Sequence, residues 1–272
     1  MLYFSHPAMP GESMTLTENK QDVQAGNEHG NSPGNQGSLE RGLAGDYPLS
    51  VGAVISEAWG RVAGNKGTIW VAILIYMGVT FVISLVLGLL LGTTPTPTPT
   101  EGVSGAATPM EQLQQLITTV IVTPMWVGTV FLGVAIASDQ PSSPTSIFAW
   151  YGKTLKLFIT YILMGLMILL GLILLVLPGI YLAVAYQLAL PLAADKDLSP
   201  WQALEASRKT VTHKWFTFFA LWLIVALAVT ASMVLLGIPL IWVLPACLIG
   251  LGVVYRDAIG AEPASLRRAA GD

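Results

Sequence analysis

The sequence is poor in charged residues. Only 11% of its 272 residues are Asp, Glu, Lys or Arg, where a soluble domain carries roughly 25%, and 53% are hydrophobic. The formal net charge of -3 gives no field that would attract nucleic acid or another polyanion. This composition excludes an ordinary soluble domain and a nucleic-acid partner, and it predicts a protein whose main partner is the lipid bilayer.

Cysteine and histidine are also scarce. The single cysteine, Cys247, lies in an apolar run, which excludes a disulfide framework and indicates a small packing residue. The three histidines, His6, His29 and His213, are far apart and do not have the spacing of metal ligands. We therefore predict neither a metal site nor a cofactor.

Charges are missing from the middle of six apolar runs. A bilayer requires about 20 consecutive apolar residues, and an ion-coupled transporter or proton relay would normally place an ionisable side chain inside a span. The runs predict an all-α polytopic membrane protein with six transmembrane helices and argue against a pump. They cover residues 68–92, 111–137, 157–177, 178–194, 215–237 and 239–255.

The rest of the chain divides around these runs. Residues 1–46 are rich in Gly, Asn, Gln, Ser and Glu, a composition that cannot bury enough apolar surface to order itself. We expect a disordered tail at 1–46, a six-helix membrane domain at 47–258 and a short tail at 259–272.

A serine precedes each pair of apolar runs. Ser50, Ser143 and Ser199 each open a segment with helical spacing of apolar residues, and each segment ends at a lysine. The third start, Ser199-Pro200-Trp201-Gln202, is the strongest, because serine, proline and glutamine each suit the unpaired N–H groups of a first turn. The pattern predicts three hairpins, each preceded by an amphipathic interfacial helix. Gene duplication and the general use of interfacial helices by membrane proteins both explain it.

Lysine and arginine fall on one side of the six-span arrangement. The three connections on the other side contain neither residue, and the first of them carries Glu101. Since positive residues favour the cytoplasmic side, we expect both termini in the cytoplasm. The basic residues are Arg61, Lys66, Lys153, Lys156, Lys196, Arg208, Lys209, Lys214, Arg256, Arg267 and Arg268.

No catalytic constellation is visible. The polar residues at the basic side that could act in an enzyme match no nucleophile–base pair and no metal cage, so we predict no catalytic residue. These residues are Asp195, Asp197, Glu205, Arg208, His213 and Asp257.

The connector at residues 195–214 is the candidate functional surface. Arg208, Lys209 and Lys214 are expected to face anionic lipid headgroups, while Asp195 and Asp197 are expected to face a protein partner. The alternative is that the connector is a structural elbow that only directs the fifth span.

Gln187 is the most polar side chain deep in a span. It is either a substrate or pore contact or an interhelical hydrogen bond that fastens the bundle. Envelope organisation or binding of a lipid or protein partner by a non-enzymatic protein is the first hypothesis. A passive or gated transporter of a small or lipid-like substrate is the second, and an enzyme acting on lipid headgroups is the third. A tunnel lined by Gln187, Thr118, Thr119 and Thr160 would favour transport, whereas a closed bundle would favour the first.

Three segments carry a resemblance. LPGIYLAVAYQLALPLAAD (177–195), LSPWQALEASRKTV (198–211) and the opening SVGAVISEAWGRVAGNKGTIW (50–70) resemble a broad group of bacterial inner-membrane proteins. That group is related to the membrane domain fused to some glycerophosphodiester phosphodiesterases. The resemblance implies six helices in a bacterial inner membrane. It implies no catalytic residues, because the phosphodiesterase activity belongs to a separate soluble domain.

Overall fold

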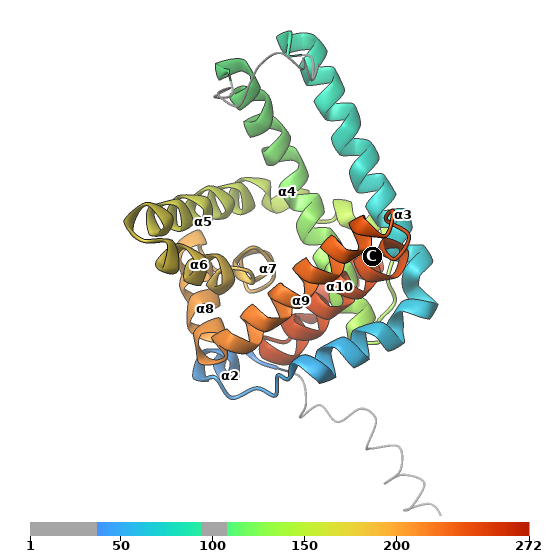
Figure 1. The fold of residues 1–272 in the computed structure, drawn as a ribbon, viewed down its shortest axis with the longest axis vertical. Helices are drawn as coiled ribbons and strands as arrows, with labels where there is room; N and C mark the ends of the chain where they lie inside the picture. The colour runs from blue at the N-terminus through green and yellow to red at the C-terminus, as the bar shows by residue number, and fades with distance from the viewer. Residues whose placement is uncertain (1–36, 94–107, 272) are drawn as a thin grey trace, which may run out of the picture. The chain divides into compact units, whose positions relative to one another are not determined.

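The computed structural model describes residues 37–93 and 108–271, and these residues contain helices and no strand. Figure 1 shows their arrangement. The helices are α2 (Leu39–Ala44), α3 (Val51–Leu91), α4 (Pro109–Ala137), α5 (Thr154–Leu174), α6 (Val176–Ala185), α7 (Ala189–Asp195), α8 (Pro200–His213), α9 (Trp215–Val234), α10 (Leu240–Ala258) and α11 (Pro263–Ala270), with two short 3-10 helices, η2 (Pro144–Phe148) and η3 (Tyr151–Lys153).

Within residues 37–93 and 108–271, six helical segments are long and apolar enough to cross a bilayer. They are α3, α4, η2 to α5, α6 with α7, α9 and α10. Consecutive members pack together as α3 with α4, α5 with α6, and α9 with α10. The chain is therefore an all-α, multi-pass integral membrane protein, and the predicted fold class is confirmed.

Two of the predicted interfacial helices take other forms. The first is not separate, because α3 runs for 41 residues through Gly64 and Gly67 without a break. Glycine weakens a helix by only about 1 kcal/mol, and no proline interrupts this stretch. Figure 1 shows that α3 changes direction along its length. The second predicted segment forms the 3-10 helices η2 and η3 and no α-helix. Only the third, α8, is a separate α-helix, with Ser199 and Gln202 forming a reciprocal cap. The predicted starts are correct in all three cases, because Ser50 caps α3 and Ser143 precedes η2.

The third and fourth spans also differ from the prediction. Helix α5 ends at Leu174, and Leu175 forms the turn. Helix α6 begins at Val176, two residues before the predicted start of the fourth span at residue 178. The fourth span is interrupted between α6 and α7. The buried Ser207 of α8 lies at this break, where its hydroxyl donates to the carbonyl of Ala185 (2.7 Å) and accepts from the N–H of Leu188 (3.2 Å). A side chain from another helix thus satisfies backbone groups that the break leaves free.

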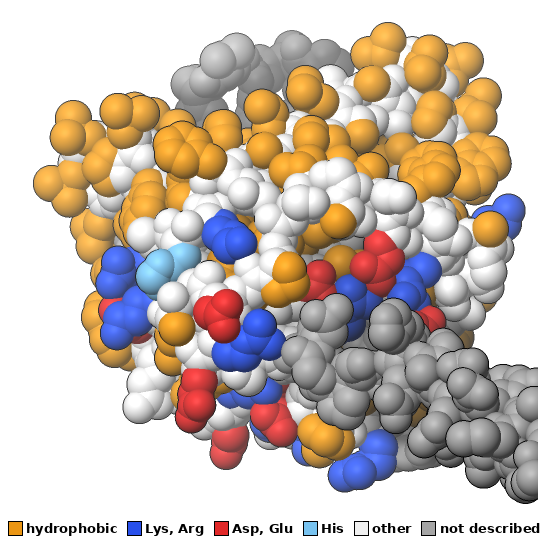
Figure 2. Space-filling model, turned by 90° about the horizontal axis from the view of Figure 1, so that it is seen from below, with side chains coloured by type: hydrophobic (Ala, Val, Ile, Leu, Met, Phe, Trp, Pro, Cys, Tyr) orange, Lys and Arg blue, Asp and Glu red, His pale blue; other side chains and the backbone are white. Residues whose placement is uncertain are grey.

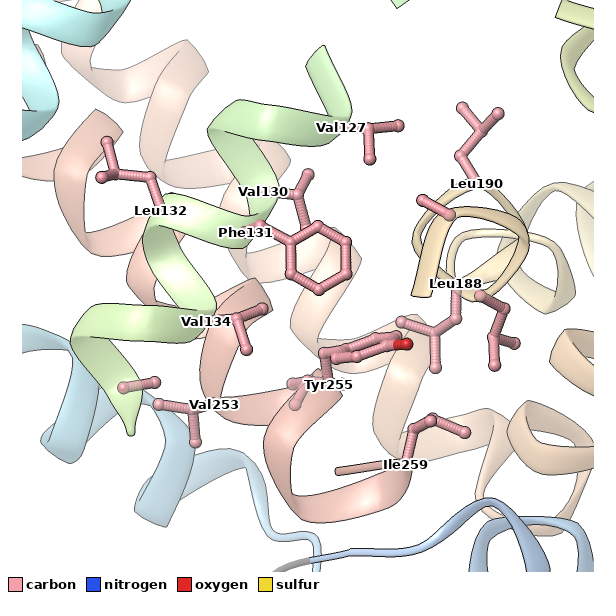
Figure 3. Close-up of a cluster of buried hydrophobic side chains, with 14 of the residues drawn as sticks. Val127, Val130, Phe131, Leu132, Val134, Leu188, Leu190, Val253, Tyr255 and Ile259 are labelled. Atoms are coloured by element: carbon pink, nitrogen blue, oxygen red, sulfur yellow. The ribbon is translucent and has the colours of Figure 1, made fainter. Parts of the chain in front are cut away.

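The second half of α4 is the centre of the core. Almost every residue from 123 to 137 is buried, with α3, α10, η2 and α11 packed around it. Gly133 and Gly252 let α4 and α10 cross closely, because a Cβ at either position would lie closer than 3.0 Å to the backbone of the other helix. Figure 3 shows Phe131 of α4 and Tyr255 of α10 in this core, with ring centroids 5.6 Å apart.

Three spans end in the same way. After α4, α7 and α10 come Asp139, Asp197 and Gly260, with φ of 53°, 53° and 68°. A capping position and a proline then start η2, α8 and α11. The pattern seen at Ser143-Pro144 and Ser199-Pro200 therefore recurs at Glu262-Pro263, where the sequence analysis did not identify it.

Both predicted tails contain ordered helices. Residues 37–46 form α2 and its flanks, so the expectation of disorder over 1–46 is wrong for this part, while residues 1–36 lie outside the described residues. The N–H of Gly37 donates to the carbonyl of Arg256 (3.0 Å), and the hydroxyl of Tyr47 donates to the carbonyl of Thr210 (2.8 Å). In the predicted tail at 259–272, α11 packs on α4 and η2, and Arg268 lies over the ring of Trp150.

Candidate functional site

Charged side chains gather on one face of the protein, which we call the charged face. Figure 2 shows Lys, Arg, Asp and Glu there and hydrophobic side chains over the opposite part of the view. The ends of α4, α7 and α10 meet α2, α8 and α11 at this face. Basic residues from Arg61 to Arg268 are thus brought together. Lys66 is an exception to the predicted one-sided arrangement, because it lies over the ring of Trp242 near the opposite end of α10. The loop with Glu101 lies outside the described residues.

An arginine cluster closes the end of α4. Arg256 of α10 forms a two-pronged pair with Glu57 of α3 and also donates to the carbonyl of Ala137. Arg61 donates to the carbonyl of Ile136 (2.8 Å) and pairs with Asp139 (2.5 Å). Because the last carbonyls of a helix lack partners and carry partial negative charge, the two guanidinium groups stabilise this end and tie α3 and α10 to α4.

A lysine cluster surrounds the end of α7. Lys153 donates to the carbonyl of Ala194 (2.6 Å), and Lys156 pairs with Asp197 (3.0 Å). Lys196 pairs with Glu262 (2.6 Å). The ammonium of Lys156, through its hydrogen bond, holds the pKa of Asp197 below its ordinary value.

The placement of Asp195 corrects the predicted partner surface. Its side chain is fully buried, and its carboxylate accepts from the hydroxyl of Tyr255 (2.8 Å) and from the N–H of Glu262 (3.1 Å). A partner cannot reach this carboxylate. The sequence around Asp195 could not predict this burial, because the residues that enclose its side chain belong to α10 and to the turn before α11. Asp197, whose side chain is 87% exposed, remains accessible.

The three basic residues predicted to meet lipid lie on or next to α8. Arg208 forms a two-pronged pair with Glu205, at 2.8 Å for both bonds. Lys209 lies 3.5 Å from the same carboxylate with a 55% exposed side chain, and the ammonium of Lys214 lies over the ring of Tyr47. One of the three positive charges is therefore balanced by Glu205, whose pKa is lowered by the Arg208 hydrogen bond.

The buried face of α8 carries Leu204 and Val211, together with small residues such as Ser207. Trp201, in the first turn of the helix, is 59% exposed. Helix α8 thus exposes both an indole ring and the ammonium of Lys209.

The polar residues that could have suggested an enzyme are engaged in separate contacts. The imidazole of His213 lies 3.0 Å from the carbonyl of Leu43, Asp257 pairs with Arg256, and Glu205 pairs with Arg208. Among the described residues no three His, Cys, Asp or Glu side chains are grouped as a metal site; His6 and His29 lie outside them.

Gln187 lies in the break between α6 and α7 and contributes to the wall of a cavity of about 440 Å³. Its Nε2 atom is buried without a hydrogen-bond partner among the described residues. Thr118, Thr119 and Thr160, which would line a transport tunnel together with Gln187, are absent from the wall of this cavity. The hydroxyls of Thr119 and Thr160 donate to carbonyls of their own helices instead.

Sequence reasoning missed Tyr255, Ser207 and Glu57 as polar residues that organise this side of the protein. Each contacts a residue far away in the chain. The only available signal was that each is a polar side chain beside or within an apolar run. That signal indicates a buried hydrogen bond but does not identify its partner.

Comparison with known proteins found no matching family model, no matching curated protein and no matching solved structure. What the protein does must therefore be inferred from the geometry of its charged face and its cavity.

Proposed function

We propose that this is a non-enzymatic protein of a bacterial inner membrane that contributes to envelope organisation. Its charged face lies at the cytoplasmic surface, and α8 binds anionic lipid headgroups there. The observation that carries the proposal is that Trp201 and Lys209 are both exposed on α8, a helix that leads directly into the spanning helix α9. The sequence resemblance to bacterial inner-membrane proteins supports the same compartment.

The chemistry of this surface suits a membrane boundary. Indole rings are enriched at the headgroup level, and each basic residue near an anionic surface contributes about 1 kcal/mol. Glu205 balances one of the charges of Arg208, Lys209 and Lys214, so the three together supply about 2 kcal/mol rather than about 3. If a protein partner binds at the same face, Asp197 is the acidic residue that it can reach.

Charge substitutions test the headgroup contact. The triple variant Arg208→Gln, Lys209→Gln and Lys214→Gln removes three positive charges and leaves Glu205 unpaired, so it should lose roughly 100-fold in preference for phosphatidylglycerol over phosphatidylcholine. The measurement is the anionic fraction of lipid retained by the full chain in mixed nanodiscs, analysed by mass spectrometry. Glu205→Gln is the matched control, and its expected effect is opposite. It removes the carboxylate that balances one positive charge and should therefore raise the anionic fraction of the retained lipid. An unchanged lipid profile in both variants would show that α8 does not bind headgroups and only directs the chain into α9.

The orientation is tested independently by reporter fusions. A reporter that is active only outside the cytoplasm should be active when fused at Gly102 and inactive at Leu198. This expectation follows from the distribution of Lys and Arg. The reverse pattern of activity would place the charged face outside and remove the basis for the headgroup proposal.

Transport of a small or lipid-like substrate is the second candidate function. The cavity with Gln187 in its wall favours it, while the absence of the predicted threonines from that wall weakens it. Reconstituted protein that moves a fluorescent phospholipid between leaflets, with loss of the activity in Gln187→Ala, would make this the better description.

A further inference from the structure

The cavity is almost entirely apolar. It lies among α3, α4, α9 and α10, and its wall is formed by side chains such as Phe218, Leu221, Val225, Ala246 and Leu251, with the amide of Gln187 as the strongest hydrogen-bonding group. Its volume of about 440 Å³ is within the roughly 300–1,000 Å³ of small-molecule pockets. A charged or strongly polar ligand would find too few partners here.

The cavity has the length of one half of a bilayer. Its lining residues extend over positions 218–228 of α9 and 243–254 of α10. At 1.5 Å per residue these stretches measure about 15 Å and about 17 Å, and half of a hydrocarbon core is about 15 Å. Both stretches begin near the charged face, at the start of α9 and the end of α10. The cavity therefore follows the hydrocarbon of the leaflet next to that face.

The mouth of the cavity is exposed where a membrane-spanning helix would meet lipid. Trp222, Ile224 and Val225 of α9 belong to the wall and are still 38% to 55% exposed. Trp59 of α3 and Trp126 of α4 also combine a place in the wall with large exposure. A ligand can thus enter laterally from the bilayer between α9 and α3.

Gln187 does not present its donor to the cavity, because its Nε2 atom is buried. A bound chain is therefore held by apolar contact with the wall.

We propose that the cavity holds one acyl chain of a glycerophospholipid from the leaflet beside the charged face. The chain lies along α9 and α10 and fills space that α9, the least buried of the spans apart from α3, leaves open. The site recognises the chain. It is independent of headgroup charge and thus goes beyond the proposed function of α8.

Photolabelling tests the site. The full chain is reconstituted in phosphatidylcholine vesicles containing a trace of phosphatidylcholine with a diazirine in one acyl chain. Labelled residues are then mapped by peptide mass spectrometry. We expect strong labelling of Leu221, Val225 and Ala246 at the wall, compared with Leu223 and Leu227, which lie outside it on α9.

Substitutions that fill the cavity should reduce the wall labelling. Ala246→Phe places a ring inside the cavity and should lower the labelling at least fivefold. Leu227→Phe places the same ring outside the wall and should leave the labelling unchanged. Ala228→Phe fills the cavity from the opposite wall and should lower the labelling in the same way, also if Ala246→Phe does not fold.

The outcomes separate this site from the headgroup surface. Phosphatidylcholine carries no net charge, so the α8 triple variant should retain full wall labelling even if it loses anionic lipid. Equal labelling of wall and outer residues, or wall labelling that survives a folded cavity-filling variant, would show only general lipid contact and would overturn the proposal.

Discussion

The spans α4 and α9 have similar hydropathy, but they occupy opposite environments. In the most apolar window of each, 78% of α4 is buried inside the protein and only 11% of α9. In α9 only Phe218 and Ser232 are buried. Apolar character thus predicts that a segment crosses a membrane, and it does not predict whether the segment faces protein or lipid, since lipid tails are as apolar as a protein core.

Small residues and anchored ends account for the difference. Gly128 and Gly133 of α4 approach the backbones of η2 and α10 so closely that a Cβ would lie closer than 3.0 Å to them, whereas α9 contains no glycine. The end of α4 is held by Arg61 and Arg256. Close approach increases van der Waals contact, which is the main source of helix association in lipid.

Truncating a leucine in each helix gives the largest expected contrast. Leu132 of α4 is fully buried, and Leu227 of α9 is 60% exposed. Leu132→Ala should lower the free energy of unfolding by about 2–3 kcal/mol, near the low end for soluble cores, because packing is lost but no water is involved. Leu227→Ala should change it by less than about 0.5 kcal/mol. Unfolding in mixed micelles measures both, and equal losses would show that α9 is buried against a partner.

Adding one methyl group tests the role of close approach. Gly133→Ala forces a Cβ against the backbone of α10 and should destabilise the protein by about 1–2 kcal/mol through overpacking. Gly78→Ala in α3 is the control, since nothing lies within 4 Å of its added Cβ and alanine favours helix. The readout is the midpoint of thermal unfolding in the same micelles. A stable Gly133→Ala variant beside an unchanged Gly78→Ala variant would contradict the tight crossing of α4 and α10.

The smallest expected effect concerns the connector that leads toward α9. Its Asp197 has a lowered pKa because it accepts a hydrogen bond from Lys156. A lowered folded-state pKa means that the contact stabilises the protein above the unfolded pKa of Asp, about 3.9, and that this stabilisation is lost as pH falls through the folded value. Wild type should therefore lose slightly more stability than Asp197→Asn between neutral and strongly acidic pH. Identical pH profiles of the unfolding midpoint would show that the exposed pair contributes nothing.

The patterns that were predictable are local or compositional. The start of α8 follows from Ser199, Pro200 and Gln202, which satisfy the first turn within three residues, and the structure confirms it. The six apolar segments follow from length and hydropathy. The first interfacial segment was not separable from its span, because Gly64 and Gly67 resemble a break in sequence but are tolerated inside α3.

The remaining features depend on residues that meet only after folding. The position of Asp195 at the end of an apolar run predicts a solvent-exposed side chain, but Tyr255 and the turn at Glu262 enclose it. The break after Ala185 persists because Ser207, from another helix, bonds its backbone. The sequence by itself determined the number of apolar spans and the one-sided distribution of Lys and Arg, since both depend on composition and spacing along the chain. Only the tertiary structure decided which spans face lipid, which charges are paired and which residues line the cavity beside Gln187, because these depend on the close approach of helices distant in sequence.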